Sequence, residues 1–255
     1  MYSINLSLRV LFLTFGGALL GIYLRSVIFA NQLTPDTRAV ITLCTGIVVT
    51  ITGLVLGLLV SSAKSCYDAQ RLLVAQLSSK LILLDRALRS YGPETKPICS
   101  QLDEFVEAAL HRIWPAESRR QAQLQPEDGA EKLEQLIGAL VPKEESQLSA
   151  KVRATAGVAD LEQTCWSMFV QSKSNVMSKP LLFVLISWLV MIFINFGLLA
   201  QPNPLAFIAL LFGAIAVSAA ILIITEMYTP FSGIQRLSSG PIRDALNQVR
   251  RCGVA

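Results

Sequence analysis

A predominantly apolar stretch of 25 residues runs from Ala39 to Ala63 and holds neither a charge nor a proline. A helix of this length spans the hydrocarbon core of a membrane, which is about 30 Å thick. Inside lipid the backbone must satisfy its own hydrogen bonds, so a single crossing segment is helical. We therefore predict a transmembrane helix over residues 39–63.

The small and polar residues of this helix share one face. At about 100° per residue they fall within a single stripe, while most Leu, Ile and Val side chains point elsewhere. The stripe consists of Thr42, Gly46, Thr50, Gly53, Gly57 and Ser61, and Lys64 continues it. Such a face is turned toward protein or water and not toward lipid.

Two explanations of this stripe are open at this point. Small residues spaced by three or four let helix backbones approach closely, and Gly53, Gly57 and Ser61 form such a series. Alternatively, copies of this helix surround an axis and their threonine hydroxyls line a pore. The two explanations are compatible, because a pore helix must also pack against its neighbours.

Three further apolar segments have the length of transmembrane helices, and we predict spans at 6–24, 181–200 and 205–225. The first has Gly17 and Gly21 as a close-packing pair, and we interpret it as a retained span because no small-residue cleavage site follows it. Together with 39–63 these segments predict two hairpins: residues 1–63 and 180–228.

Residues 64–179 predict a helical region outside the membrane. No Gly or Pro occurs between Leu58 and Tyr91, so we expect one continuous helix from Arg38 to Ser90, about 80 Å long. Further helices are expected at 96–114, 130–140 and 144–177, with an exposed loop between 115 and 129. Residues 229–255 are expected to form a tail.

The charge distribution agrees with a membrane protein. Hydrophobic residues make up 53% of the chain and charged residues 16%, and the net charge is +4. The whole excess of basic over acidic residues lies outside residues 64–179, which argues against a nucleic-acid-binding face. Basic residues flank one side of the predicted spans, against Arg25 and Arg38 on the other, so both termini and the middle region are expected in the cytoplasm.

Candidate chemistry is sparse. The five cysteines form no CxxC pair, His111 is the only histidine, and no glycine-rich phosphate loop occurs, so we expect no enzyme, cofactor or metal site. Within the predicted spans, Asn195 is expected to make a helix–helix hydrogen bond. Glu226 is either a solvated interfacial carboxylate or an anchor for the turn at 229–233.

Four stretches together resemble the bestrophin-like bacterial family of unknown function. They are LGLLVSSAKSCYDAQ (56–70), LLDRALRSYGPET (83–95), WLVMIFINFGLLAQPN (188–203) and ITEMYTPFSGIQRLSSGPIRDAL (224–246). Their order and spacing agree over nearly the whole chain, except around 115–143. One departure is Tyr228, which stands where the family pattern commonly has an acidic residue.

The resemblance implies an all-α membrane protein with four transmembrane helices in two hairpins and a cytoplasmic helical layer. It also implies a homopentamer in the bacterial inner membrane, whose second membrane helix lines a central pore for small inorganic ions. The pore-lining residues would be Thr42, Gly46, Val49, Thr50, Gly53, Gly57, Ser61 and Lys64, with Arg38 at the pore mouth. Since the stripe has no apolar or aromatic constriction of its own, a hydrophobic gate would come from Val49 or Val60 at its edge, or be absent.

The function expected from this resemblance is a passive ion channel. The alternative is a non-conducting membrane scaffold or signalling component whose cytoplasmic helices bind a partner. A coupled carrier is disfavoured, because the spans contain neither a broken helix nor a central ionisable residue. Five copies of Lys64 would favour anions at the inner mouth and Asp68 would offset them, so ion selectivity stays open.

Overall fold

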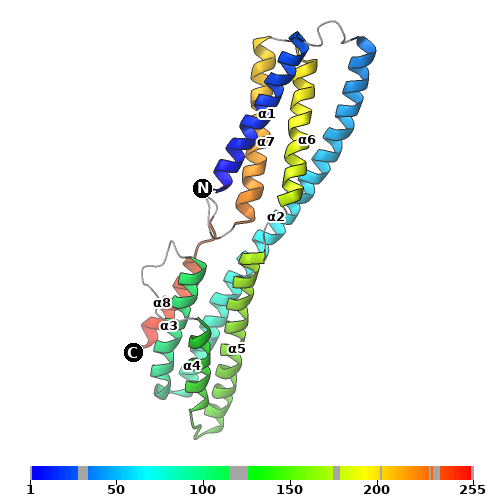
Figure 1. Cartoon of the computed structure of the whole chain (residues 1–255). Helices are drawn as coiled ribbons and strands as arrows, with labels where there is room; N and C mark the ends of the chain where they lie inside the picture. Colours follow the sequence, from blue (N-terminus) through cyan, green and yellow to red (C-terminus); the bar gives the residue numbers. More distant parts are fainter. Residues whose placement is uncertain are drawn as a thin grey trace. The chain divides into compact units, whose positions relative to one another are not determined.

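The computed structural model describes residues 2–27, 34–114, 126–174, 179–201, 203–229, 231 and 236–253, and within these ranges it contains helices and no strands (Figure 1). The helices are α1 (Tyr2–Val27), α2 (Pro35–Tyr91), the 3-10 turn η1 (Pro93–Thr95), α3 (Lys96–Ile113), α4 (Pro126–Gly138), α5 (Glu145–Ser174), α6 (Lys179–Leu199), α7 (Pro204–Met227) and α8 (Gly240–Gly253). The predicted all-α class is confirmed.

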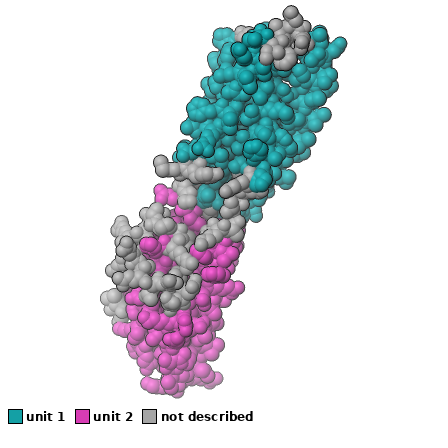
Figure 2. Space-filling model, viewed as in Figure 1, with its two compact units in different colours: residues 1–67, 176–229, 233–235 teal, residues 68–175, 230–232, 236–255 magenta. Residues whose placement is uncertain are grey.

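The chain divides into two compact units, drawn in different colours in Figure 2. The apolar unit comprises residues 1–67, 176–229 and 233–235, and the polar unit comprises residues 68–175, 230–232 and 236–255. Helix α2 contributes to both units because no residue interrupts it. It ends at Tyr91, where Gly92 adopts a φ of 130° that residues with side chains rarely take.

Four helices are long and apolar enough to cross a membrane: Ser3–Val27, Pro35–Tyr91, Pro180–Leu199 and Pro204–Met227. Each contains one of the spans predicted from the sequence, apart from Ala200, which lies just beyond α6. Helix α2 continues far beyond residue 63 into the polar unit. The other three helices extend past the predicted limits by only a few residues, because polar residues at the ends of an apolar stretch can continue the helix. The number of spans that cross the membrane stays a prediction.

Within the apolar unit, α1 packs closely against α6. A Cβ atom on Gly21 would collide with the backbone oxygen of Ile194 and lie 2.8 Å from the backbone nitrogen of Leu198. A Cβ atom on Gly197 would in turn collide with the backbone of Ala18. The close-packing role predicted for Gly17 and Gly21 is therefore confirmed, since a Cβ on Gly17 would meet Val190 and Ile194 at 3.3 Å.

Polar side chains join α1 to its partners where lipid cannot satisfy them. The hydroxyl groups of Ser7 and Ser218 lie 2.7 Å apart, and each also contacts the other residue's backbone oxygen. At the far end, the guanidinium of Arg25 donates to the backbone oxygens of Leu199 and Ala200. A cation at the C-terminus of α6 satisfies carbonyl groups that have no partner within the helix.

The polar unit is built around the second half of α2, as predicted from its leucine periodicity. Leu77, Leu81, Leu84 and Leu88 are buried in one core with residues of α3, α4, α5 and α8. Helix α5 approaches α2 closely at Gly157, where a Cβ would lie 3.2 Å from Leu84 Cδ1. This apolar core holds α2, α3, α4, α5 and α8 together, and these helices carry the exposed charges of the unit.

Two expectations for the polar unit need correction. Helix α4 begins at Pro126 and not at Ala130, because proline is favoured in the first turn of a helix. The expected tail contains α8, whose Ile242, Ala245, Leu246 and Val249 are buried in the core. Most of the loop predicted at 115–129 lies outside the described residues.

Candidate pore-lining face of helix α2

The apolar part of α2 presents one face to the rest of its unit. Thr45, Thr52, Leu59 and Ala63 are buried there, and the last two share a core with Leu185 and Leu189 of α6. These four positions are spaced by seven, seven and four residues, which places them on one side of the helix. The exposed sides of this part of α2 are therefore available to lipid, to water or to a second copy of the chain.

The predicted stripe lies on such an outer side. Its residues are all exposed in this chain: Thr42, Gly46, Val49, Thr50, Gly53, Gly57, Ser61 and Lys64, and Arg38 before them. A Cβ atom built on Gly46, Gly53 or Gly57 meets nothing within 4 Å. Packing against another described helix of the same chain is therefore not the reason for these glycines, whereas packing against a second copy remains compatible with them.

The threonine hydroxyls of the stripe have a defined orientation. Thr42 donates to the backbone oxygen of Arg38 at 2.8 Å, and Thr50 donates to that of Gly46 at 2.9 Å. Because each hydroxyl proton is used within the helix, the oxygen lone pairs are left to face outward. The stripe can accordingly accept hydrogen bonds from water, as the wall of a wetted conduit would.

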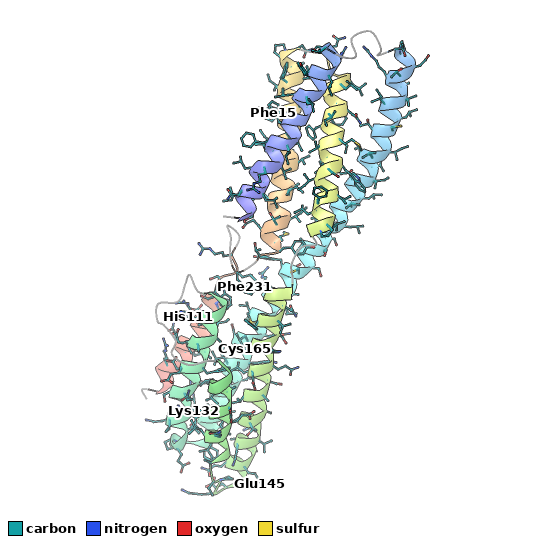
Figure 3. The ribbon with its side chains drawn as sticks, in the orientation of Figure 1. Phe15, His111, Lys132, Glu145, Cys165 and Phe231 are labelled. Atoms are coloured by element: carbon teal, nitrogen blue, oxygen red, sulfur yellow. The ribbon has the colours of Figure 1, made fainter. Side chains whose placement is uncertain are left out.

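A third side of α2 carries large apolar residues. Leu43 and Leu58 are 70% and 71% exposed, and Ile47 and Leu54 are similarly open. In Figure 3 the side chains along one edge of this part of α2 project away from the other helices of the unit. The helix therefore has a buried side, a small-residue side and a large apolar side, and only the last has the composition of a lipid-facing surface.

Among the described residues, two side-chain hydrogen bonds join the apolar part of α2 to the rest of its unit. Asn195 of α6 donates from Nδ2 to Thr45 Oγ1 at 3.0 Å, which confirms the predicted helix–helix role of Asn195. Tyr228, directly after α7, donates from its hydroxyl to Ser62 Oγ at 3.1 Å. The sequence indicated Tyr228 only as a departure from a family pattern and did not indicate its partner.

Glu226 is buried, and its carboxylate accepts a hydrogen bond from the hydroxyl of Ser3. The expectation of a solvated interfacial carboxylate is therefore wrong, because α1 covers the end of α7. The alternative, an anchor for the turn at 229–233, concerns a segment whose greater part lies outside the described residues. Within the described ranges, no group of three or more His, Cys, Asp or Glu could hold a metal ion.

The polar unit has an open hollow of about 420 Å³ between α2 and α5. Its lining includes the buried Leu84 and Ala87 and the exposed Arg86 and Arg153. Lys80, also in this lining, donates to the backbone oxygen of Asp160 at 3.2 Å and to Thr164 Oγ1 at 2.9 Å. Sequence reasoning missed this hollow, because it depends on which faces of two distant segments meet.

Comparison with known proteins places this architecture in a family. A family model described as the Bestrophin-like domain matches residues 12–242. The protein therefore belongs to the Bestrophin-like family, as the four resembling stretches predicted. No curated protein sequence matches the chain significantly.

Solved structures show the same fold. A bacterial Bestrophin homolog from Klebsiella pneumoniae is similar with a TM-score of 0.69 and 17% sequence identity, over 97% of each chain. A single-residue variant of that homolog matches with a TM-score of 0.68 and 16% identity, over 98% of this chain and 99% of its own. At this level of identity the likeness establishes the bestrophin fold. The role of the α2 stripe has to be argued from the residues of this chain.

Proposed function

We propose that the protein is a homo-oligomeric channel that conducts small inorganic ions passively, through a pore lined by the small-residue stripe of α2. The observation that carries the proposal is the stripe itself: it is exposed, and nothing in the described chain packs on its glycines. Family membership supports the proposal, since bestrophins are channel-type proteins. A fold alone does not fix a function, so the proposal rests on this surface.

The mechanism follows from the chemistry of the stripe. Copies of α2 surround an axis, and outward-facing lone pairs of Thr42 and Thr50 hold water along the conduit. Val49 and Val60, both partly exposed, supply the apolar constriction at which the water column is interrupted. Arg38 and Lys64 set the electrostatic potential at the two mouths.

We further propose a pentamer in the bacterial inner membrane, with both termini and the polar unit in the cytoplasm. The argument is the excess of basic residues on one side of the predicted spans. Its partners are membrane lipid, further copies of the chain and the permeating ions. A reporter fused after Ser90 should be active only on the cytoplasmic side, and activity outside would reverse the topology.

The conduit is tested by cysteines placed at Thr50 and Gly53 in a cysteine-free background. Water-soluble thiol reagents should react at both positions and change the single-channel current of the purified oligomer in a planar bilayer. Cysteine at Leu54, on the large apolar side, is the matched control and should neither react nor change the current. Currents unaffected by modification at Thr50 and Gly53 would contradict the proposal.

The hollow between α2 and α5 favours a second candidate, a non-conducting scaffold whose polar unit binds a partner. An amphipathic hollow with basic residues in its lining is a surface on which another molecule could bind. This candidate predicts a well-formed oligomer that carries no current and whose axis is closed to thiol reagents. The bilayer recordings and the labelling at Thr50 therefore distinguish the two.

A further inference from the structure

Helix α2 is attached to the apolar unit differently from α1. Helix α1 contacts α6 backbone to backbone at Gly21 and Gly197. Helix α2 instead meets α6 through side chains, among them Leu59 and Leu189. In lipid such apolar contacts give little preference for one arrangement over another, because the lipid tails are as apolar as the side chains they replace.

The two hydrogen bonds of α2 therefore have a disproportionate role in fixing its position. Thr45 and Ser62 lie about 25 Å apart along the helix axis at 1.5 Å per residue, close to the two ends of the apolar stretch. At 100° per residue they also lie about 100° apart around the helix, so the two bonds hold it from different directions. Two such points determine both the tilt and the rotation of α2.

One buried group opposes this arrangement. Thr52 lies two turns beyond Thr45 on the same buried side, and its Oγ1 has no hydrogen-bond partner among the described residues. A buried hydroxyl without a partner is unfavourable, and rotation of α2 toward water would relieve it. The structure thus contains both a pair of bonds that hold α2 and a group that favours turning it.

We propose that Asn195 and Tyr228 are positioning residues that hold α2 in the rotation seen here, through Thr45 and Ser62, against the opposing preference of Thr52. Through this rotation they also set the open probability of the channel. This second role rests on the proposed channel function. The attachment itself does not depend on conduction and can be measured separately.

The first experiment measures the rotation of α2 without any current. In an otherwise cysteine-free oligomer that keeps Thr52, Ala63→Cys reports on the buried side of α2 through its rate of reaction with a thiol reagent, because Ala63 is buried on the same side as Thr52. Tyr228→Phe and Asn195→Leu should each raise this rate about threefold, the factor expected for one hydrogen bond in a membrane protein, and their combination should raise it further. Tyr23→Phe, which removes an exposed hydroxyl from α1, is the matched control and should leave the rate unchanged.

The second experiment measures open probability in planar bilayers. Tyr228→Phe and Ser62→Ala should change it by the same factor, and the double variant by no more than either, because both remove one bond. Ser62→Thr and Thr45→Ser keep a hydroxyl and should behave like the parent, whereas Thr45→Val should not. Thr52→Val removes the opposing hydroxyl and should change open probability in the opposite direction to Tyr228→Phe.

The two experiments separate the proposals. An Ala63→Cys rate that is the same in the parent, Tyr228→Phe and Asn195→Leu overturns the positioning role. A rate that rises in those variants, in an oligomer that never conducts, supports the positioning role and contradicts the channel. Tyr228→Phe and Ser62→Ala each remove one hydroxyl without adding bulk, so the test does not depend on the folding of Asn195→Leu.

Discussion

Gly21 of α1 and Ile194 of α6 touch through their backbones, so closely that no Cβ atom could be placed on Gly21 without colliding with the Ile194 oxygen. Gly197 makes the reciprocal contact with Ala18, one turn from Ile194 on the same helix. This crossing joins the first predicted hairpin to the second. The backbones of α1 and α6 are in direct contact here, whereas α2 contacts α6 only through side chains among the described residues.

Substitution at this crossing should destabilise the apolar unit. Gly21→Ala and Gly197→Ala each force the two backbones apart, and overpacking of this kind costs about 1–3 kcal/mol. Thermal unfolding in detergent, followed by tryptophan fluorescence, should show a lower midpoint for both variants. Gly16→Ala is the control on the same helix, because a Cβ there meets nothing within 4 Å; equal midpoints for all three would contradict the crossing.

Trp114→Phe should destabilise the polar unit. The buried indole nitrogen donates to the backbone oxygen of Leu237 at 2.8 Å, and the ring meets Phe231 edge-on at 5.0 Å. Phenylalanine keeps a ring but leaves that buried oxygen without its donor, at a cost of about 1–3 kcal/mol. Limited proteolysis should cut the variant faster near α8, whereas Trp166→Phe, at an exposed site of α5, should leave the rate as in the parent.

Arg250 should stabilise the packing of α8 on α3, and this stabilisation should weaken at high salt. Its guanidinium donates two hydrogen bonds to Asp103, at 2.6 and 2.9 Å, and one to Glu107 at 2.8 Å. These contacts raise the pKa of Arg250, chiefly through the bonds to Asp103. Arg250→Met should speed hydrogen exchange in α8, by an amount corresponding to at most about 1 kcal/mol because the pair is partly exposed.

The salt dependence supplies the control for that prediction. The difference between Arg250→Met and the parent should shrink in 1 M salt, where the screening length is about 3 Å. Arg86→Met, in the lining of the hollow on α2, should leave α8 exchange unchanged at any ionic strength. An exchange difference that persists in 1 M salt would mean that Arg250 acts by packing its aliphatic stem and not by charge.

Cys165, labelled on α5 in Figure 3, should be chemically silent in the folded protein. Burial, aided by the nearby Glu162, raises the pKa of its thiol from 9.0 to about 12. Maleimide at pH 8 should therefore spare Cys165 in the native protein and label it once the protein is unfolded. Labelling of Cys165 at the same rate in the native and the unfolded protein would contradict this expectation.

The same shift predicts a pH dependence. As pH rises through about 9, the unfolded chain releases the Cys165 proton while the folded chain retains it, so unfolding becomes easier. The stability that the buried neutral thiol contributes is complete below that pH and is lost above it. The decline in melting temperature between pH 8 and pH 10 should thus be smaller in Cys165→Ala than in the parent.

The sequence alone determined those helices and helix ends that depend only on neighbouring residues. Residues 39–63 and the three other apolar stretches are long enough to predict their own helices, and Gly92 with Pro93 marks the end of α2. The glycine pair of α1 and the polar Asn195 were identified as contact residues, because few other roles suit such residues inside lipid. The spacing of Ile242, Ala245, Leu246 and Val249 would also have predicted α8.

The tertiary structure decided which surfaces meet. Periodicity predicts that the stripe from Thr42 to Lys64 is turned away from lipid, yet only the fold shows that none of its glycines packs on a described part of the same chain. Likewise, Glu226 is buried because α1 lies over it, and Tyr228 finds Ser62, more than 160 positions away, because α7 ends beside α2. A local pattern determines which side of a helix is polar, but the partner of that side depends on contacts between distant segments, which no local pattern contains.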